Sequence, residues 1–200
     1  MIIQSFFEEY LFFIALTFIL VLSGLTARFL ILALGFAKLQ KGVFVIDELT
    51  GHLLVRKGFL QTFIRIGTWN ILVSSIVICS GIISLGTLPL VWAFLNLGLF
   101  FLDPVLFKRY LYPWIEETAN ILSAALGAWM GQNLHEFLNV LPVFVWTFMS
   151  IFILYMISAL LETLKIHPGV KRLNFCSFFI FRAASEILLL SSMKAEPWGR

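Results

Sequence analysis

The longest apolar stretch of the chain places the strongest constraint on its fold. Residues 10–36, "YLFFIALTFILVLSGLTARFLILALGF", contain a single charged side chain, Arg28. About 20 largely apolar residues are enough for a helix to cross a bilayer, where every backbone polar group must be paired within the structure. The stretch therefore predicts a membrane-spanning helix that is tilted, or whose Arg28 extends toward the nearer interface.

Further apolar stretches follow, and the composition agrees with them. The chain is 60% hydrophobic and 12% charged, whereas a soluble domain is about 25% charged. We expect an all-α fold, a polytopic membrane helical bundle of about five spanning helices with added amphipathic or interfacial helices. Residues 1–200 form one transmembrane domain in this interpretation. The later predicted spans are residues 67–86, 88–102, 114–131 and 143–164.

The distribution of Lys and Arg predicts the orientation. Cytoplasmic loops carry an excess of these residues, and five of them lie in residues 37–66: Lys38, Lys41, Arg56, Lys57 and Arg65. We therefore expect residues 37–66 to be cytoplasmic and the N-terminus to be external, in a multi-pass protein of the cytoplasmic (inner) membrane.

Within that segment, "VRKGFLQTFIRI" has two different faces. At helical spacing its apolar residues fall on one side and its polar residues on the other, as in a helix that lies on a membrane surface. The sequence predicts such an amphipathic helix at the inner surface, with the contact residues Lys57, Phe59, Phe63 and Arg65.

Two apolar stretches leave alternatives open. Residues 67–86 and 88–102 are joined by a short Gly/Pro turn, which favours an ordinary hairpin, with a re-entrant element lining a cavity as the alternative. Residues 174–192 contain Arg182 and Glu186 at i,i+4 spacing. An interfacial or partner-packed helix is favoured there over a sixth span.

Two adjacent carboxylates, Glu116 and Glu117, stand at the start of the span 114–131. They either cap or salt-bridge the helix start, where the helix dipole favours anions, or form a proton, ion or partner site facing the bundle interior. Because neighbouring helical residues point about 100° apart, we expect only one of them to face inward. Glu116 is the expected one, because it lies four residues before Asn120 on the small-residue side.

Small residues recur every four positions behind these carboxylates. Such a stripe allows another helix to approach closely, which is how helices associate in lipid. The second span has a similar small and polar surface, so we expect the two spans to face each other. The predicted helix-packing stripe consists of Ala119, Ser123, Gly127 and Gly131.

Several functional classes lack support in the sequence. The surplus positive charge is spread over short loops without a compact basic face, so nucleic-acid binding is not expected. "HEFLN" begins like a zinc-protease motif, but Asn139 stands where the second His is needed. No serine elbow or Gly-rich phosphate loop occurs. We expect no enzymatic activity, no metal and no cofactor.

Several short motifs occur in the order seen in one family. They are "FLQTFIRIGTWN" before a small-residue span, "NLG" at residues 96–98, Glu116 entering a small-residue helix, and "ISALLETLKIHP". In this order the chain resembles the stage II sporulation protein M family over about residues 55–168. Pro113 and Trp114 depart from the "PHG" of that family's signature. The family-type positions are Asn70, Asn96, Glu116, Ala119, Gly127, Gly131 and Glu162.

The resemblance implies an integral membrane protein without a known enzymatic activity, from a family associated with envelope remodelling and with circular-bacteriocin gene clusters. Our first hypothesis is a membrane subunit that scaffolds or docks a cell-envelope complex. The alternative is a transporter or export permease subunit for a peptide, small molecule or ion. Expected partners are membrane lipids and other membrane proteins or a second copy. The candidate intramembrane polar site is Asn70, Asn96, Glu116 and Glu162.

Overall fold

The computed structural model describes residues 2–34, 58–100 and 110–167. These ranges are helical and contain no strand, so the predicted all-α fold is confirmed for them. The predictions for residues 37–57 and 174–192 lie outside the described residues. The elements are α1 (Ile2–Ala33), α3 (Phe59–Ile83), α4 (Thr87–Trp92), the π-helix η1 (Ala93–Phe100), α6 (Tyr112–Gln132), the 3-10 helix η2 (Leu134–Glu136) and α7 (Phe137–Ile166).

Three of the described segments are long and apolar enough to cross a membrane. They are Ser5–Ile31, Phe59–Ile83 and Leu134–Ile166, and they belong to α1, α3 and the η2–α7 segment. The helix over Thr87–Leu99 is apolar but shorter, and α6 carries two glutamates and many small residues. The chain therefore has three helices of membrane-spanning character in its described part, and the predicted number of five is not confirmed.

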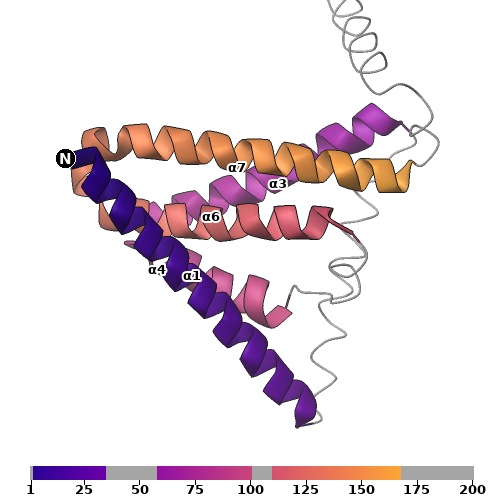
Figure 1. Cartoon of the computed structure of the whole chain (residues 1–200), viewed down its shortest axis with the longest axis horizontal. Coiled ribbons are helices and arrows are strands. Elements are labelled where there is room, and N and C mark those ends of the chain that lie inside the picture. Colours follow the sequence, from indigo (N-terminus) through magenta and orange to yellow (C-terminus); the bar gives the residue numbers. More distant parts are fainter. Residues whose placement is uncertain (1, 35–57, 101–109, 168–200) are drawn as a thin grey trace, which may run out of the picture.

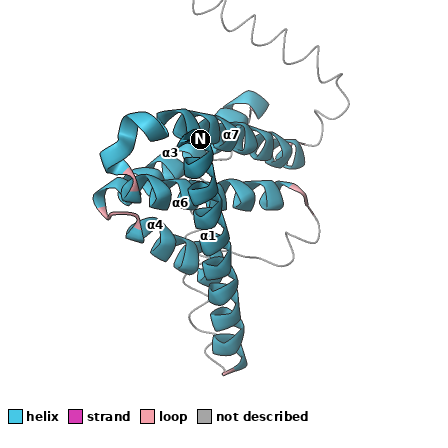
Figure 2. Cartoon of the chain, turned by 60° about the vertical axis from the view of Figure 1, so that its left-hand side comes forward, coloured by secondary structure: helices cyan, strands magenta, loops and turns pink. Residues whose placement is uncertain are grey.

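Helices α3, α6 and α7 contact one another and form the body of the bundle. Helix α1 crosses this body obliquely, and its second half runs away from α6 and α7 (Figure 1). It contacts η1 as well as α6. The view turned by 60° shows the same oblique crossing of α1 over the other helices (Figure 2).

The bundle has two ends, which we name after α6 residues. At the Trp129 end, Phe6 and Tyr10 of α1 contact the Trp129 ring with centroid separations of 6.3 and 5.7 Å. At the Tyr112 end, the start of α3 meets the end of α7, where the Thr62 hydroxyl lies 3.2 Å from His167 Nε2. Helices α3 and α6 consequently run in the same direction, and α7 runs opposite to both.

Helix α3 begins earlier than the sequence predicted. It is continuous from Phe59, so residues 59–66 are its first two turns and the separate surface helix was a wrong prediction. The apolar face that we predicted for this segment is present, because Phe63 and Ile66 are buried against Ala159 of α7. Arg65 lies on the exposed side, and Lys57 is outside the described residues. Helix α7 covers this apolar face, which we expected to lie on a membrane surface.

A tight turn joins α3 to α4 at the Trp129 end. Leu85 and Gly86 both have positive φ, at 52° and 88°, which is uncommon for a leucine and easy for a glycine. The Gln132 side-chain amide donates to the Leu85 carbonyl over 2.8 Å. A Cβ atom at Gly86 would also meet the backbone of Ala128. The turn is therefore fixed against α6, and the 87–100 segment returns along it.

Beyond the turn, α4 passes directly into η1. The sequence stretch 88–102 that we predicted as a third span is thus a helix of two parts within its described residues. Gly98 of η1 lies against Gly24 of α1, where an added Cβ would be 2.8 Å from the Gly24 Cα. The two backbones can approach this closely because neither residue has a side chain.

Candidate functional site

The predicted small-residue stripe lies at the contact between α6 and α3. Its four residues, Ala119, Ser123, Gly127 and Gly131, are buried. A Cβ atom at Gly127 would lie 3.0 Å from the Ile78 Cα. A Cβ atom at Gly131 would overlap the backbone of Gly81. Glycine therefore allows the two helix backbones to touch along the part of this contact that lies toward the Trp129 end.

A serine pair continues this contact toward the middle of the bundle. The side-chain oxygens of Ser74 and Ser123 are 2.7 Å apart, and both residues are buried. Ser123 also donates to the Ala119 carbonyl over 2.7 Å, so the Ser74 hydroxyl is the donor between the two. Ser80 of α3 and Ser84, the residue directly after α3, donate to carbonyls of that helix.

A second polar contact joins α6 to α7. The Tyr155 hydroxyl donates to Asn120 Oδ1 over 2.6 Å, and both residues are buried. Asn120 follows Glu117 by three residues on α6, so the two side chains extend from the same side of the helix. Three helices thus contribute polar side chains to one region, which we call the polar core: Asn70, Ser74, Glu117, Asn120, Ser123 and Tyr155.

The inward-facing carboxylate is Glu117, which corrects the prediction that Glu116 would face the interior. Glu117 is 7% exposed, whereas Glu116 is half-buried. The prediction assumed a single packed side of α6. In the structure α6 contacts α1, α3, α4, η1 and α7, so the side that carries Glu117 is also covered.

Of the four residues that we predicted for the intramembrane polar site, Asn70 is the one that belongs to the polar core. It is 8% exposed on α3, one turn before Ser74. Its Nδ2 atom has no hydrogen-bond partner among the described residues, and the same holds for Glu117 Oε1. Buried polar groups without partners are rare in folded proteins. These two atoms are therefore the least satisfied polar groups of the polar core.

The other predicted members of the polar site are distributed over other elements. Asn96 is half-buried on η1, and Glu162 is half-buried on α7 near the Tyr112 end. The proposed set of four therefore spans four helical elements, and Asn70 is its member at the α3–α6 contact.

Aromatic and basic residues gather at the Tyr112 end. Lys165 Nζ lies 4.2 Å from the centroid of the Tyr110 ring and 3.2 Å from the Tyr112 hydroxyl oxygen, to which it donates. The Ser158 hydroxyl donates to the Tyr112 carbonyl over 3.2 Å. Tyrosine and lysine in this combination are typical of a membrane–water interface.

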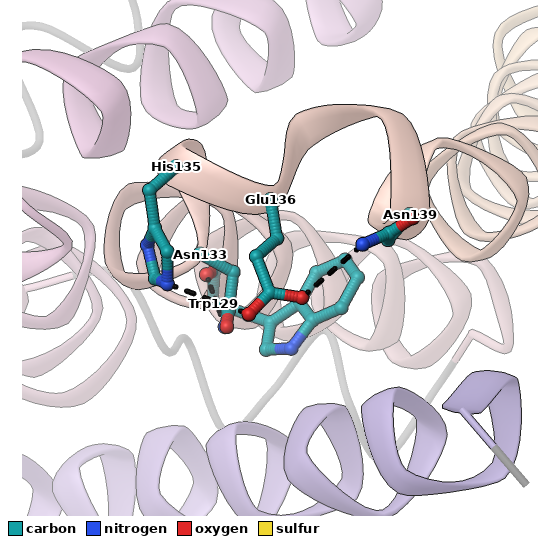
Figure 3. Close-up of polar contacts among 5 residues, drawn as sticks. All are labelled: Trp129, Asn133, His135, Glu136 and Asn139. Atoms are coloured by element: carbon teal, nitrogen blue, oxygen red, sulfur yellow. Dashed lines mark hydrogen bonds and ion pairs between the residues drawn. The ribbon is translucent and has the colours of Figure 1, made fainter.

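The "HEFLN" segment, considered above for zinc, forms the connection at the Trp129 end (Figure 3). His135 Nε2 lies 3.6 Å from Glu136 Oε1, and Asn139 Nδ2 donates to Glu136 Oε2 over 3.3 Å. Asn133 donates back to the Trp129 carbonyl over 3.1 Å. Among the described residues no group of three or more His, Cys, Asp or Glu side chains is arranged to hold a metal. The segment is a polar helix connection.

Sequence reasoning missed Glu117, Asn120 and Tyr155 as members of the polar core. A signal was available for Asn120, because an amide three positions after a glutamate in a small-residue helix reaches the same side as the carboxylate. Tyr155 gave none, because a tyrosine in an apolar helix can face lipid equally well. A comparison of the chain with family models, with curated proteins and with solved structures finds no match.

Proposed function

We propose that the chain is a non-enzymatic integral membrane subunit that docks other proteins of a cell-envelope complex. The observation that carries the proposal is the way the body of the bundle is held together. Gly81, Gly127 and Gly131 bring two helix backbones into contact. Hydrogen bonds between side chains fasten α3 to α6 and α6 to α7. A bundle whose helices are closely packed and joined by hydrogen bonds in this way can serve as a rigid support for other proteins.

The orientation in the membrane is part of the same proposal. Arg65 and Lys165 are near the Tyr112 end, whereas Glu8, Glu9 and Glu136 are near the Trp129 end. By the positive-inside rule the Tyr112 end is cytoplasmic and the Trp129 end, with the N-terminus, is external. In this arrangement α6 and the 87–100 segment lie at membrane depth beside the three long apolar helices.

The outer sides of α1 and α7 supply the surfaces for docking. Phe29 of α1, Leu34 directly after α1 and Trp146 of α7 are each more than 70% exposed. In a bilayer such side chains face acyl chains or the helices of a partner. The resemblance to the sporulation protein M family is retained as part of this proposal, because its motifs fall on α3, η1, α6 and α7.

Isolation of the tagged full-length chain in a mild detergent tests the docking function. We expect one or more envelope proteins to co-purify in fixed proportion. A Trp146→Ala variant should lose a partner that binds α7, while Trp69→Ala, on the exposed side of α3, serves as a matched control. Purification of the chain alone, with both variants identical to the parent, would refute the proposal.

A transporter or permease subunit is the second candidate, and two observations favour it. The 87–100 segment is a helix broken by a π-helical part, as is found at substrate pathways in membrane proteins. Glu117 also places an ionisable group inside the bundle, which in membrane proteins marks functional sites. Reconstitution into liposomes decides between the candidates, since a transporter subunit confers solute or ion flux and a docking subunit confers none.

A further inference from the structure

The polar core contains two unsatisfied atoms on facing helices. Glu117 Oε1 belongs to α6 and Asn70 Nδ2 to α3, and each residue is more than nine-tenths buried. One atom is a hydrogen-bond acceptor when Glu117 is ionised, and the other is a donor. Their chemistry is therefore complementary.

The register of the two helices places these residues on the same side of the α3–α6 contact. Helices α3 and α6 run in parallel, and Val77 packs with Ala124 in one apolar cluster. Asn70 precedes Val77 by seven residues, and Glu117 precedes Ala124 by seven residues. Seven residues are close to two whole turns, with a drift of only about 20°. Asn70 and Glu117 thus each lie about two turns toward the Tyr112 end from a member of the same cluster, at nearby levels of the bundle.

We propose that Glu117 is a proton-binding carboxyl group within the bundle and that Asn70 is its partner across the helix contact. An asparagine amide has a donor end and an acceptor end, and rotation of the side chain exchanges them. Such a side chain can present its NH₂ group to the carboxylate and its carbonyl oxygen to the carboxylic acid. The proton joins Glu117 Oε1 from water and returns to water, and no other bond changes.

The α6–α7 contact uses one end of the Asn120 side chain. Asn120 Oδ1 accepts from Tyr155, so the Asn120 NH₂ group is the part left for other contacts. Glu117 Oε1 has no hydrogen-bond partner among the described residues, Asn120 included, and is therefore the carboxyl oxygen that is left to take the proton.

The described ionisable groups of the elements around Glu117 do not pair a cation with it. Glu116 precedes it on α6, and α7 contributes Tyr155, the half-buried Glu162 and Lys165, whose Nζ donates to the Tyr112 hydroxyl and lies over the Tyr110 ring. Arg65 of α3 is exposed on a different side from Asn70. The 87–100 segment contains no ionisable residue, and the ionisable groups of α1 nearest this level are Tyr10 and Arg28. A proton is thus the simplest positive partner for this carboxylate. The site does not depend on whether the chain docks proteins or forms a pathway.

Labelling of the full-length protein with dicyclohexylcarbodiimide tests this inference. This apolar reagent adds to a protonated carboxyl group in apolar surroundings and leaves a stable adduct, which peptide mass spectrometry locates. We expect the adduct on Glu117 and little on Glu116. Above its midpoint the labelling should fall roughly tenfold for each pH unit, as the protonated fraction does. Adducts on Glu116 instead, pH-independent labelling, or no adduct on Glu117 in the folded protein would each overturn the assignment.

Two variants test the role of Asn70. Asn70→Leu keeps an apolar side chain of similar size and removes the amide, so the pH dependence of Glu117 labelling should shift. Ser75→Ala is the matched control on α3, because the Ser75 hydroxyl donates to the Ile71 carbonyl of its own helix. An unchanged pH dependence in Asn70→Leu would remove Asn70 from the site. Glu117→Gln should abolish the adduct, and an adduct that persists there would show that another carboxyl group reacts.

Discussion

Ser74 and Ser123 join α3 to α6 through side-chain oxygens that are 2.7 Å apart in a buried position. The bond is the centre of a longer contact, with glycines toward the Trp129 end and with Asn70 and Glu117 toward the Tyr112 end. A side-chain hydrogen bond and close backbone packing therefore both hold α3 and α6 together.

A double-mutant cycle should measure this serine bond. Ser74→Ala and Ser123→Ala each remove one partner, and we expect a coupling free energy of about 0.6 kcal/mol, with roughly 1.7 kcal/mol as the upper end for such bonds in membrane proteins. Unfolding of the detergent-solubilised protein in a denaturing detergent gives the four free energies. Strictly additive single effects would show that the pair contributes no mutual stabilisation.

The glycine contact predicts a strong difference between two alanine substitutions on α3. At Gly81 a Cβ atom would overlap the Gly127 backbone, whereas at Gly67 it would meet the flexible Met156 side chain, with Sδ 3.2 Å away. Gly81→Ala should lower the free energy of unfolding by about 1–3 kcal/mol or more through overpacking. Gly67→Ala should change it little. Heat-induced loss of the monodisperse peak in size-exclusion chromatography compares the two, and equal stability would contradict the close contact.

Removal of the Tyr155 hydroxyl should lower the free energy of unfolding, because it leaves a buried amide oxygen without a hydrogen-bond donor. Tyr155→Phe leaves Asn120 Oδ1 without its 2.6 Å donor in a buried position, which costs about 1–3 kcal/mol. Tyr10→Phe is the control, because the Tyr10 hydroxyl donates over 3.2 Å to the Leu122 carbonyl inside continuous helix α6. We expect the smaller loss for Tyr10→Phe in the same unfolding assay. The reverse order would mean that the Tyr155–Asn120 bond does not stabilise the bundle.

The proposed orientation predicts which ends of the bundle are accessible from outside the cell. In a background with Cys79 and Cys176 replaced by serine, Leu138→Cys lies at the Trp129 end and Leu111→Cys at the Tyr112 end, and both native leucines are well exposed. A membrane-impermeant maleimide should label Leu138→Cys in intact cells and Leu111→Cys only after permeabilisation. The opposite pattern would invert the topology.

The apolar stretches were sufficient to predict the helices, because in such a composition only helices satisfy the backbone. Their bounds were less predictable, since packing decided them. The sequence 59–66 has the amphipathic pattern of a surface helix, but its apolar side packs on Ala159 and its neighbours in α7. A protein surface and a membrane surface require the same pattern, so the sequence could not distinguish them.

The polar core was predictable only in part. Asn70 was predicted as a family-type position and as part of the small and polar surface of its span. The choice between Glu116 and Glu117 depended on how many sides of α6 are covered, and a pattern on one helix does not contain that information. The π-helical part of the 87–100 segment had no sequence signal either, because its residues suit an α-helix equally well.

The oblique crossing of α1 has a consequence for the order of assembly. Helix α1 is held by residues that are synthesised much later: Gly98 meets Gly24, and Trp129 meets Phe6 and Tyr10. Its hydroxyl groups at Ser23 and Thr26 need no such partner, because they are paired with carbonyls of α1 itself. The described contacts of α1 with the rest of the bundle can therefore form only after η1, α6 and α7 have been synthesised.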